Sequence, residues 1–235
     1  MSQHSKMHNY DLQDERKQFQ LERLILFSDA VFAIAITLLV IEIRVPTIEN
    51  SSNLTSDIKS KLGHMLPEFF GFLLSFAVIG QFWTSHHKLF GYVKNYNNGL
   101  LWMNLLFLFW VVLVPFTSGL NSQYGNVNFV WMIYCLNLFF ISISLVLLFI
   151  YVANSKRNLS DLVNNKIISK FSIIRSILVA CIFLAAALFT IPDNTFFSYL
   201  SRYCLFLIPV VISINNRNQN KALKRIAGVT NTTKV

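Results

Sequence analysis

Ionisable side chains are rare inside the long apolar stretches of this chain, so the few that occur there are the first candidates for chemistry. Asp29 lies six residues into the stretch RLILFSDAVFAIAITLLVI. His86 and His87 close the second apolar stretch, and Arg175 lies near the start of the fifth. A charged side chain at the bilayer centre costs about 2.5–3.5 kcal/mol on insertion scales unless it is paired or hydrated. Such groups can carry protons or bind cations, or they can pair with polar neighbours and fix helix packing.

Asp29 has two interpretations that the sequence leaves open. At 1.5 Å per residue it lies only about 9 Å beyond Arg23, so it is close to one end of its helix. We favour an interhelical hydrogen bond or ion pair that fixes helix packing. The alternative is a proton-conducting pathway or proton-coupled transporter in which Asp29 and a histidine relay protons. The candidate partners of Asp29 are His86, His87, Asn104 and Arg175.

Other potential ligands and nucleophiles do not form a reactive pattern. His4 and His8 are spaced four residues apart in a polar leader but lack a third ligand, so we do not predict a metal site. Cys135, Cys181 and Cys204 fall inside apolar stretches without CxxC spacing and are expected to be packing residues. The chain has no HExxH, GxSxG or nucleotide-binding loop. The sequence therefore predicts neither an enzyme nor a cofactor.

The first apolar stretch has two different faces when it is drawn as a helix. At about 100° per residue, with Ile34 at zero, Thr37 lies at about −60°, Leu38 at about +40° and Ile41 at about −20°. Asp29 lies nearly opposite, at about −140°. If copies of the first face surrounded a symmetry axis, they would form a narrow apolar constriction with one hydroxyl layer. From the helical wheel alone, the same stripe fits a face toward lipid or toward the core equally well.

The composition indicates a helical membrane protein that positions these residues. Of 235 residues, 54% are hydrophobic and 13% are charged, which is outside the usual range of soluble domains. A spanning helix needs about 20 apolar residues, and the continuous runs do not alternate as the strands of a membrane barrel do. We predict an all-α membrane protein with six transmembrane helices. Their expected ranges are 24–43, 62–86, 100–120, 127–153, 171–191 and 194–214.

The net charge of +9 is distributed unevenly along the chain. Lys and Arg number 4, 2, 4 and 5 in residues 1–23, 87–99, 154–170 and 215–235, against 3, 0 and 0 in residues 44–61, 121–126 and 192–193. The positive-inside rule therefore predicts that both termini are cytoplasmic. We expect a leader (1–23), a six-helix transmembrane channel domain (24–214) and a basic cytoplasmic tail (215–235). The tail fits anionic lipid headgroups rather than nucleic acid.

One motif makes the chain similar to a known family. Arg23, Phe27, Ser28 and Asp29 form the pattern RxxxFSD. Together with FWTSHHKLF at the end of the second span and LLWMNLLFLFWVVLVPF in the third, it resembles the transmembrane protein 175 family of endolysosomal potassium channels and their prokaryotic relatives. The motif occurs once, which resembles the prokaryotic type with a single unit. This resemblance implies a homotetramer with four first helices around a central cation pathway, and no P-loop filter, since TVGYG is absent.

The resemblance also implies roles for individual residues. Ile34 corresponds to the main hydrophobic constriction, Leu38 and Ile41 to further narrow rings, and Thr37 to a layer that favours potassium. The motif residues would hold the first helix against its own subunit, with His86 or His87 among their contacts. The resemblance implies a potassium-permeable channel of modest selectivity over Na⁺ in a bacterial inner membrane. Its partners would be other copies of itself, potassium ions and membrane lipid, with no cofactor and no nucleic acid. The alternative of a proton pathway stays open.

Overall fold

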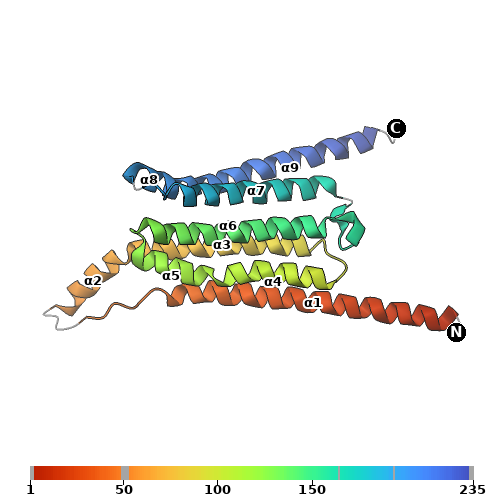
Figure 1. Cartoon of the computed structure of the whole chain (residues 1–235), viewed down its shortest axis with the longest axis horizontal. Helices are drawn as coiled ribbons and strands as arrows, with labels where there is room; N and C mark the ends of the chain where they lie inside the picture. Colours follow the sequence, from red (N-terminus) through yellow and green to blue (C-terminus); the bar gives the residue numbers. More distant parts are fainter. Residues whose placement is uncertain (1–2, 49–52, 164, 193, 233–235) are drawn as a thin grey trace.

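The computed structural model describes residues 3–48, 53–163, 165–192 and 194–232, and over these ranges the chain forms helices without a β-strand. The α-helices are α1 (Gln3–Ile41), α2 (Leu54–His64), α3 (Leu66–Phe90), α4 (Asn98–Val112), α5 (Val114–Tyr124), α6 (Asn128–Val152), α7 (Lys166–Leu188), α8 (Thr195–Tyr203) and α9 (Leu207–Thr232). Short 3-10 helices cover Ser155–Arg157, Asp161–Val163 and Cys204–Phe206. Figure 1 shows the long helices running side by side.

Six helical segments in the described ranges are long and apolar enough to cross a membrane. They are Glu15–Ile41, Leu66–Phe90, Asn98–Tyr124, Asn128–Val152, Lys166–Leu188 and Thr195–Arg225. Each overlaps one of the six predicted spans, so the prediction of an all-α membrane protein with six spans is confirmed. The chain is an integral membrane protein.

The first helix begins well before the predicted span and includes most of the predicted leader, residues 1–23. α1 is continuous over 39 residues, which makes it about 58 Å long at 1.5 Å per residue. The hydrocarbon core is only about 30 Å thick, so the N-terminal part of α1 extends beyond it. Figure 1 shows this part of α1 and the far part of α9 projecting from the same end of the bundle, as an even number of spans requires. The side chains of His4 and His8 lie outside the described part of the chain.

The third and sixth spans are each interrupted near a proline. α4 ends at Val112, α5 begins at Val114, and Pro115 occupies the first turn of α5. Proline lacks a backbone N–H and its ring clashes with the preceding turn, so a first helical turn is where it fits. Pro209 lies in the first turn of α9 in the same way, directly after the 3-10 turn Cys204–Phe206.

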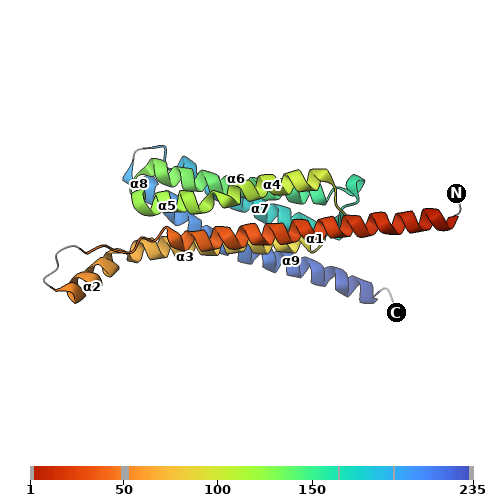
Figure 2. The same ribbon diagram turned by 90° about the horizontal axis from the view of Figure 1, so that it is seen from below.

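α6 is the most enclosed span. Of its most apolar 18-residue stretch 61% is buried, against 17% for the corresponding stretch of α3. α6 packs against α4, α5 and α7, α7 packs against α9, and α1 packs against α3, α4 and α5. α1 therefore runs along the outside of the bundle, at the lower edge in Figure 1 and in front in Figure 2, where it can meet other molecules.

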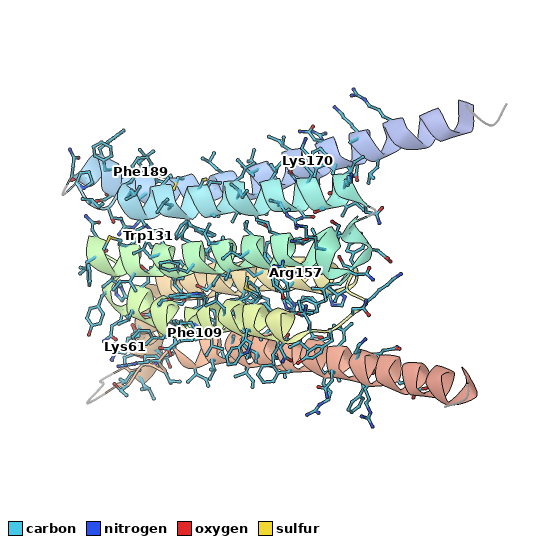
Figure 3. The ribbon with its side chains drawn as sticks, turned by 45° about the vertical axis from the view of Figure 1, so that its right-hand side comes forward. Lys61, Phe109, Trp131, Arg157, Lys170 and Phe189 are labelled. Atoms are coloured by element: carbon cyan, nitrogen blue, oxygen red, sulfur yellow. The ribbon has the colours of Figure 1, made fainter. Side chains whose placement is uncertain are left out.

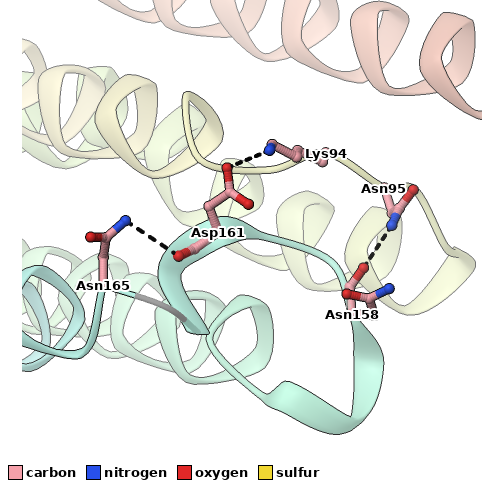
Figure 4. A network of polar contacts seen from close by, with 5 residues as sticks. All are labelled: Lys94, Asn95, Asn158, Asp161 and Asn165. Carbon is pink, nitrogen blue, oxygen red and sulfur yellow. Dashed lines mark hydrogen bonds and ion pairs between the residues drawn. The ribbon is translucent and has the colours of Figure 1, made fainter.

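Polar contacts join the two loops at the end from which α1 and α9 project. The Lys94 ammonium lies 2.6 Å from the Asp161 carboxylate, and the Asn95 amide donates to the Asn158 carbonyl at 2.7 Å. Asn165 donates to the Asp161 carbonyl at 3.4 Å. Figure 4 shows these contacts linking the loop after α3 to the loop after α6. Arg157 and Lys170 lie toward this end in Figure 3, and Trp131 and Phe189 toward the opposite end. This end is the basic one, as the uneven charge distribution predicts.

Candidate functional site

α1 presents one face to its own bundle. Buried residues recur along it at intervals of three or four, which is the spacing of a single helical face. They are Leu21, Leu24, Ser28, Phe32, Ala35 and Leu39. This face packs against α3, α4 and α5. The periodicity alone therefore determines which side of the helix is turned inward.

The opposite face of α1 is exposed in the single chain, and it carries the predicted constriction residues. The side chains of Ile34, Leu38 and Ile41 are 58%, 38% and 69% exposed. Thr37 is exposed among them, and its hydroxyl donates to the carbonyl of Ala33 or Ile34 at 3.0 and 2.9 Å. A hydroxyl has one hydrogen and two lone pairs. Because the hydrogen is used within the helix, the oxygen of Thr37 is left able to accept from the open side.

A buried hydrogen-bonded chain holds α1 to α4 and α3. The Ser28 hydroxyl donates to the Leu24 carbonyl at 2.8 Å, and the Asn104 amide nitrogen donates to the Ser28 oxygen at 2.8 Å. The Asn104 oxygen lies 2.7 Å from Nε2 of His86. Since this amide oxygen can only accept, Nε2 of His86 carries the hydrogen. All three side chains are at most 1% exposed, so these hydrogen bonds are shielded from solvent.

Asp29 has a different partner from those predicted. The indole Nε1 of Trp83 donates to the Asp29 carboxylate at 2.9 Å. His87 stacks on the Trp83 ring at 5.4 Å, and Arg175 donates to the Ser85 hydroxyl at 3.4 Å. Among the described contacts Asp29 therefore bonds to Trp83 rather than to one of the four candidate partners, whereas Asn104, and His86 through it, meet the motif at Ser28. The physical reason is the rotation of α3, which turns Trp83 and His87, four residues apart, toward Asp29 and turns His86 toward α4.

Arg23 and Phe27 lie on the more exposed side of α1. Phe27 is 51% exposed, and the Arg23 guanidinium lies 5.7 Å from the ring centre of Phe19 on the same helix. Residues 23, 27 and 34 are separated by four and seven positions, so they share a face. The predicted anchoring role of these two residues stays a prediction. Only Ser28 and Asp29 of the motif make hydrogen bonds to other helices.

A mixed-charge cavity of about 760 Å³ lies directly beyond Ile41, at the end of the exposed face. Glu42, Arg44, Lys61 and Glu68 are among its lining residues, so its charges balance. The Glu42 carboxylate packs against Gly119 of α5, where a β-carbon would collide with it. The exposed face of α1 therefore ends in polar surroundings. Among the described residues, no group of three or more His, Cys, Asp and Glu side chains comes together as a metal site.

Trp83 is the residue whose contact the sequence reasoning missed. The sequence suggests for it only a place in an aromatic belt at headgroup level and in the family resemblance, although an indole N–H inside a span needs an acceptor. The available signal was its position four residues before His87 on the same helical face. Only the rotation of α3 relative to α1 determines which donor Asp29 meets.

Comparisons with known proteins agree with this architecture. A family model described as the endosomal/lysosomal potassium channel TMEM175 matches residues 23–115. A potassium channel of Streptomyces collinus is 40% identical over 98 residues, 42% of this chain and 46% of that protein. The endosomal/lysosomal proton channel TMEM175 of Mus musculus is 30% identical over 109 residues, 45% of this chain and 22% of that protein. The chain thus matches less than half the length of these two relatives.

A solved structure extends the similarity to most of the chain. The crystal structure of a lysosomal potassium-selective channel TMEM175 homolog from Chamaesiphon minutus aligns with a TM-score of 0.68 and 28% sequence identity. The alignment covers 85% of this chain and all of that chain. The similarity of fold therefore reaches beyond the segment that the family model matches.

Proposed function

We propose that this chain is a member of the TMEM175 family and a potassium-permeable cation channel in which four copies place α1 around a central pathway. The exposed face of α1 with Ile34, Thr37, Leu38 and Ile41 carries this proposal. The family is one of ion channels, and its relatives include proteins named potassium channels. An apolar face toward lipid needs no partner, since lipid tails are equally apolar. It is family membership that favours a symmetric assembly around this face.

The proposed pathway works by constriction rather than by a carbonyl filter. Ile34 and Ile41 are β-branched and therefore stiff at χ1, so rings of them would hold a narrow apolar passage that excludes water when closed. Thr37 lies between these rings, and four Thr37 oxygens would offer a permeating ion one layer of ligands. One layer of hydroxyl oxygens replaces fewer of the ion's water ligands than a cage of carbonyl oxygens does. We therefore expect only modest preference for K⁺ over Na⁺.

The proposal includes an orientation in the membrane. The basic ends of α1 and α9 lie in the cytoplasm, following the positive-inside rule, and the membrane is the inner membrane of a bacterial cell. Residues 1–23 and 215–235 are then cytoplasmic extensions of the domain 24–214. The partners are three further copies, membrane lipid and the permeant potassium ion, and we propose no cofactor.

A proton pathway through Asp29 and His86 or His87 is the second candidate, and the mouse relative named a proton channel supports it. The contacts of these residues argue against it. The side chain bonded to Asp29 is the Trp83 indole, a donor that cannot pass a proton onward. His86 is enclosed between the rings of Phe90 and Phe107, with centroid distances of 4.3 and 5.3 Å. The geometry therefore favours structural roles for Asp29 and His86.

Recordings from the purified full chain in planar bilayers test the proposal. We expect a K⁺ current with Na⁺ less permeant, measured from reversal potentials under bi-ionic conditions. A control with K⁺ gradients replaced by pH gradients measures proton current separately. Chloride preference, or silence with a chain that is tetrameric by light scattering in detergent, would contradict the channel. A monomer in detergent and in bilayer would contradict the proposed assembly.

A further inference from the structure

Arg175 lies between two adjacent cavities that the ion pathway does not use. The first, which we call the apolar groove, has a volume of about 270 Å³ and lies between α3, α6, α7 and α9. It is lined by Val78, Phe82, Leu145, Val179, Phe183 and Ile212, among others. The second, the cytoplasmic cleft, has about 680 Å³ and includes Lys88, Asn216, Gln219 and Asn220 in its lining. Arg175 lines both cavities.

Arg175 is unusually poorly paired for a buried guanidinium. Its side chain is 8% exposed, and its hydrogen bond is the long one to Ser85 at 3.4 Å. A guanidinium carries five N–H donors, and a charge at this depth needs a partner. None of the described residues that line either cavity is acidic. Arg175 therefore has N–H donors and a positive charge available to a ligand, and the described residues that line the two cavities supply no anion.

The two cavities follow one another along the direction of the helices. Arg175 is nine residues after Lys166, the first residue of α7, hence about 14 Å along the helix. The cytoplasmic cleft reaches the basic end of the bundle, where Lys88 lies in the last turn of α3. Lys170 of α7, which does not line this cleft, lies toward the same end (Figure 3). The apolar groove continues from Arg175 in the opposite direction, past Val179 to Phe183. From the basic end inward, the order is therefore the polar cytoplasmic cleft, the buried guanidinium of Arg175 and the apolar groove.

The same order describes an anionic lipid of the cytoplasmic leaflet. We propose that an anionic phospholipid binds between α3 and the α7–α9 pair, with its phosphate on Arg175, its headgroup in the cytoplasmic cleft and one acyl chain in the apolar groove. Arginine pairs with phosphate through two parallel hydrogen bonds. Basic pockets between transmembrane helices on the cytoplasmic side are known to take such headgroups. Both volumes are near or within the range of about 300–1,000 Å³ that ligand sites occupy.

Charge complementarity selects this occupant over others. A zwitterionic lipid could fill the groove equally well, but the cationic part of its headgroup would add a third positive charge beside Arg175 and Lys88. A helix from a neighbouring copy would cover the groove without supplying an anion, unless it carried an acid. Free inorganic phosphate would satisfy Arg175 and leave the apolar groove empty. Each of these alternatives predicts a different experimental result.

Lipid binding to the purified full chain tests the proposal. Dioleoyl phosphatidylglycerol, dioleoyl phosphatidylcholine and inorganic phosphate are added separately in detergent, and bound lipid per chain is counted by native mass spectrometry. We expect phosphatidylglycerol to be retained and to raise the melting temperature, with weaker effects from the other two. Arg175→Gln should lose about tenfold in phosphatidylglycerol affinity, the size expected for a charged hydrogen bond. Lys156→Gln removes the same charge at an exposed residue on the same side and should bind as wild type.

Two further variants keep the proposal testable if Arg175→Gln does not fold. Lys88→Gln weakens only the cytoplasmic cleft, and Val179→Trp fills only the apolar groove; both should reduce retention of phosphatidylglycerol. Unchanged retention in all three variants would overturn the proposal, as would equal retention of phosphatidylcholine. A phosphate effect equal to that of phosphatidylglycerol would identify a simple anion site and refute the lipid. A changed oligomer size in Val179→Trp with unchanged lipid binding would identify an interface between copies instead.

Discussion

The two sides of α1 differ both in composition and in what they contact. The inward side includes Ser28, whose hydroxyl belongs to a buried chain through Asn104 to His86. The outward side is built from Ile34, Leu38 and Ile41, with Thr37 as its hydroxyl. The buried polar residues Ser28, Asn104 and His86 are thus used in packing α1 against its own bundle. The ordinary apolar residues are left on the surface where we propose that ions pass.

This difference shows why the energetic cost of placing a residue in the bilayer is, by itself, a poor guide to that residue's function. A polar group in a span must find a partner, whether or not it does chemistry. Asn104 is buried and uses both its amide nitrogen and its oxygen in hydrogen bonds within the bundle. An apolar ring needs no partner and yet can control the passage of water and ions when several copies meet.

The largest expected effect comes from making the outward side polar at its proposed constriction. Ile34→Asn should raise single-channel conductance by at least about tenfold, which corresponds to a barrier lowered by roughly 1.4 kcal/mol. The reason is that four amide side chains would hydrate the ring. Single-channel recording in symmetric K⁺ measures it.

The matched control for Ile34→Asn is Val40→Asn on the same helix. Val40 is 54% exposed, close to the 58% of Ile34, but it lies about 120° around the helix from Ile34. We expect its conductance to stay within about twofold of wild type, since only one face lines the pathway. If both variants have the same conductance, or if neither differs from wild type, the proposal that the Ile34 face of α1 lines the ion pathway is contradicted.

On the inward side, the strongest test is removal of the central amide. Asn104→Leu should lower stability by roughly 1–3 kcal/mol, because it leaves the buried groups of Ser28 and His86 without their partner. Thermal unfolding in detergent measures the loss. Asn218→Leu makes the same change at an exposed position of α9 and should be neutral. Equal melting temperatures for both variants would show that the buried chain does not hold α1 in place.

The helical class, the six spans and the two sides of α1 could be predicted from the sequence, because they depend on local hydrophobicity and periodicity. Contacts between spans could not. Whether Asp29 meets Trp83 or His86 depends on how α3 is rotated about its axis, and adjacent residues on a helix differ by about 100°. A helix just before the membrane could be expected, but its extension back to Gln3 could not, since the polar residues there have no apolar periodicity to indicate a helix. The roles of Ile34 and Thr37 in conduction stay predictions.

A smaller effect is expected from the hydroxyl on the outward side. Thr37→Val keeps the shape and removes the oxygen whose lone pairs face outward, so the K⁺ over Na⁺ permeability ratio should fall by about threefold, or roughly 0.6 kcal/mol. Reversal potentials under bi-ionic conditions measure the ratio. Thr37→Ser, which restores the oxygen, is the control and should keep the wild-type ratio. A ratio that is the same in both variants would remove Thr37 from the proposed selectivity layer.

The smallest effect concerns the bond between Asp29 and Trp83, because the carboxylate is only partly buried and water can replace its partner. Trp83→Phe should cost about 0.6 kcal/mol, the average for hydrogen bonds between membrane helices, and Trp102→Phe at an exposed site on α4 should cost less. Asp29→Asn should then lower the free energy of unfolding less in the Trp83→Phe background than in the wild type. The reason is that the effects of mutations at residues in contact are not additive. Additive losses of stability, accompanied by lost proton current in Asp29→Asn alone, would instead make Asp29 a relay group. The inward side of α1 would then share in transport.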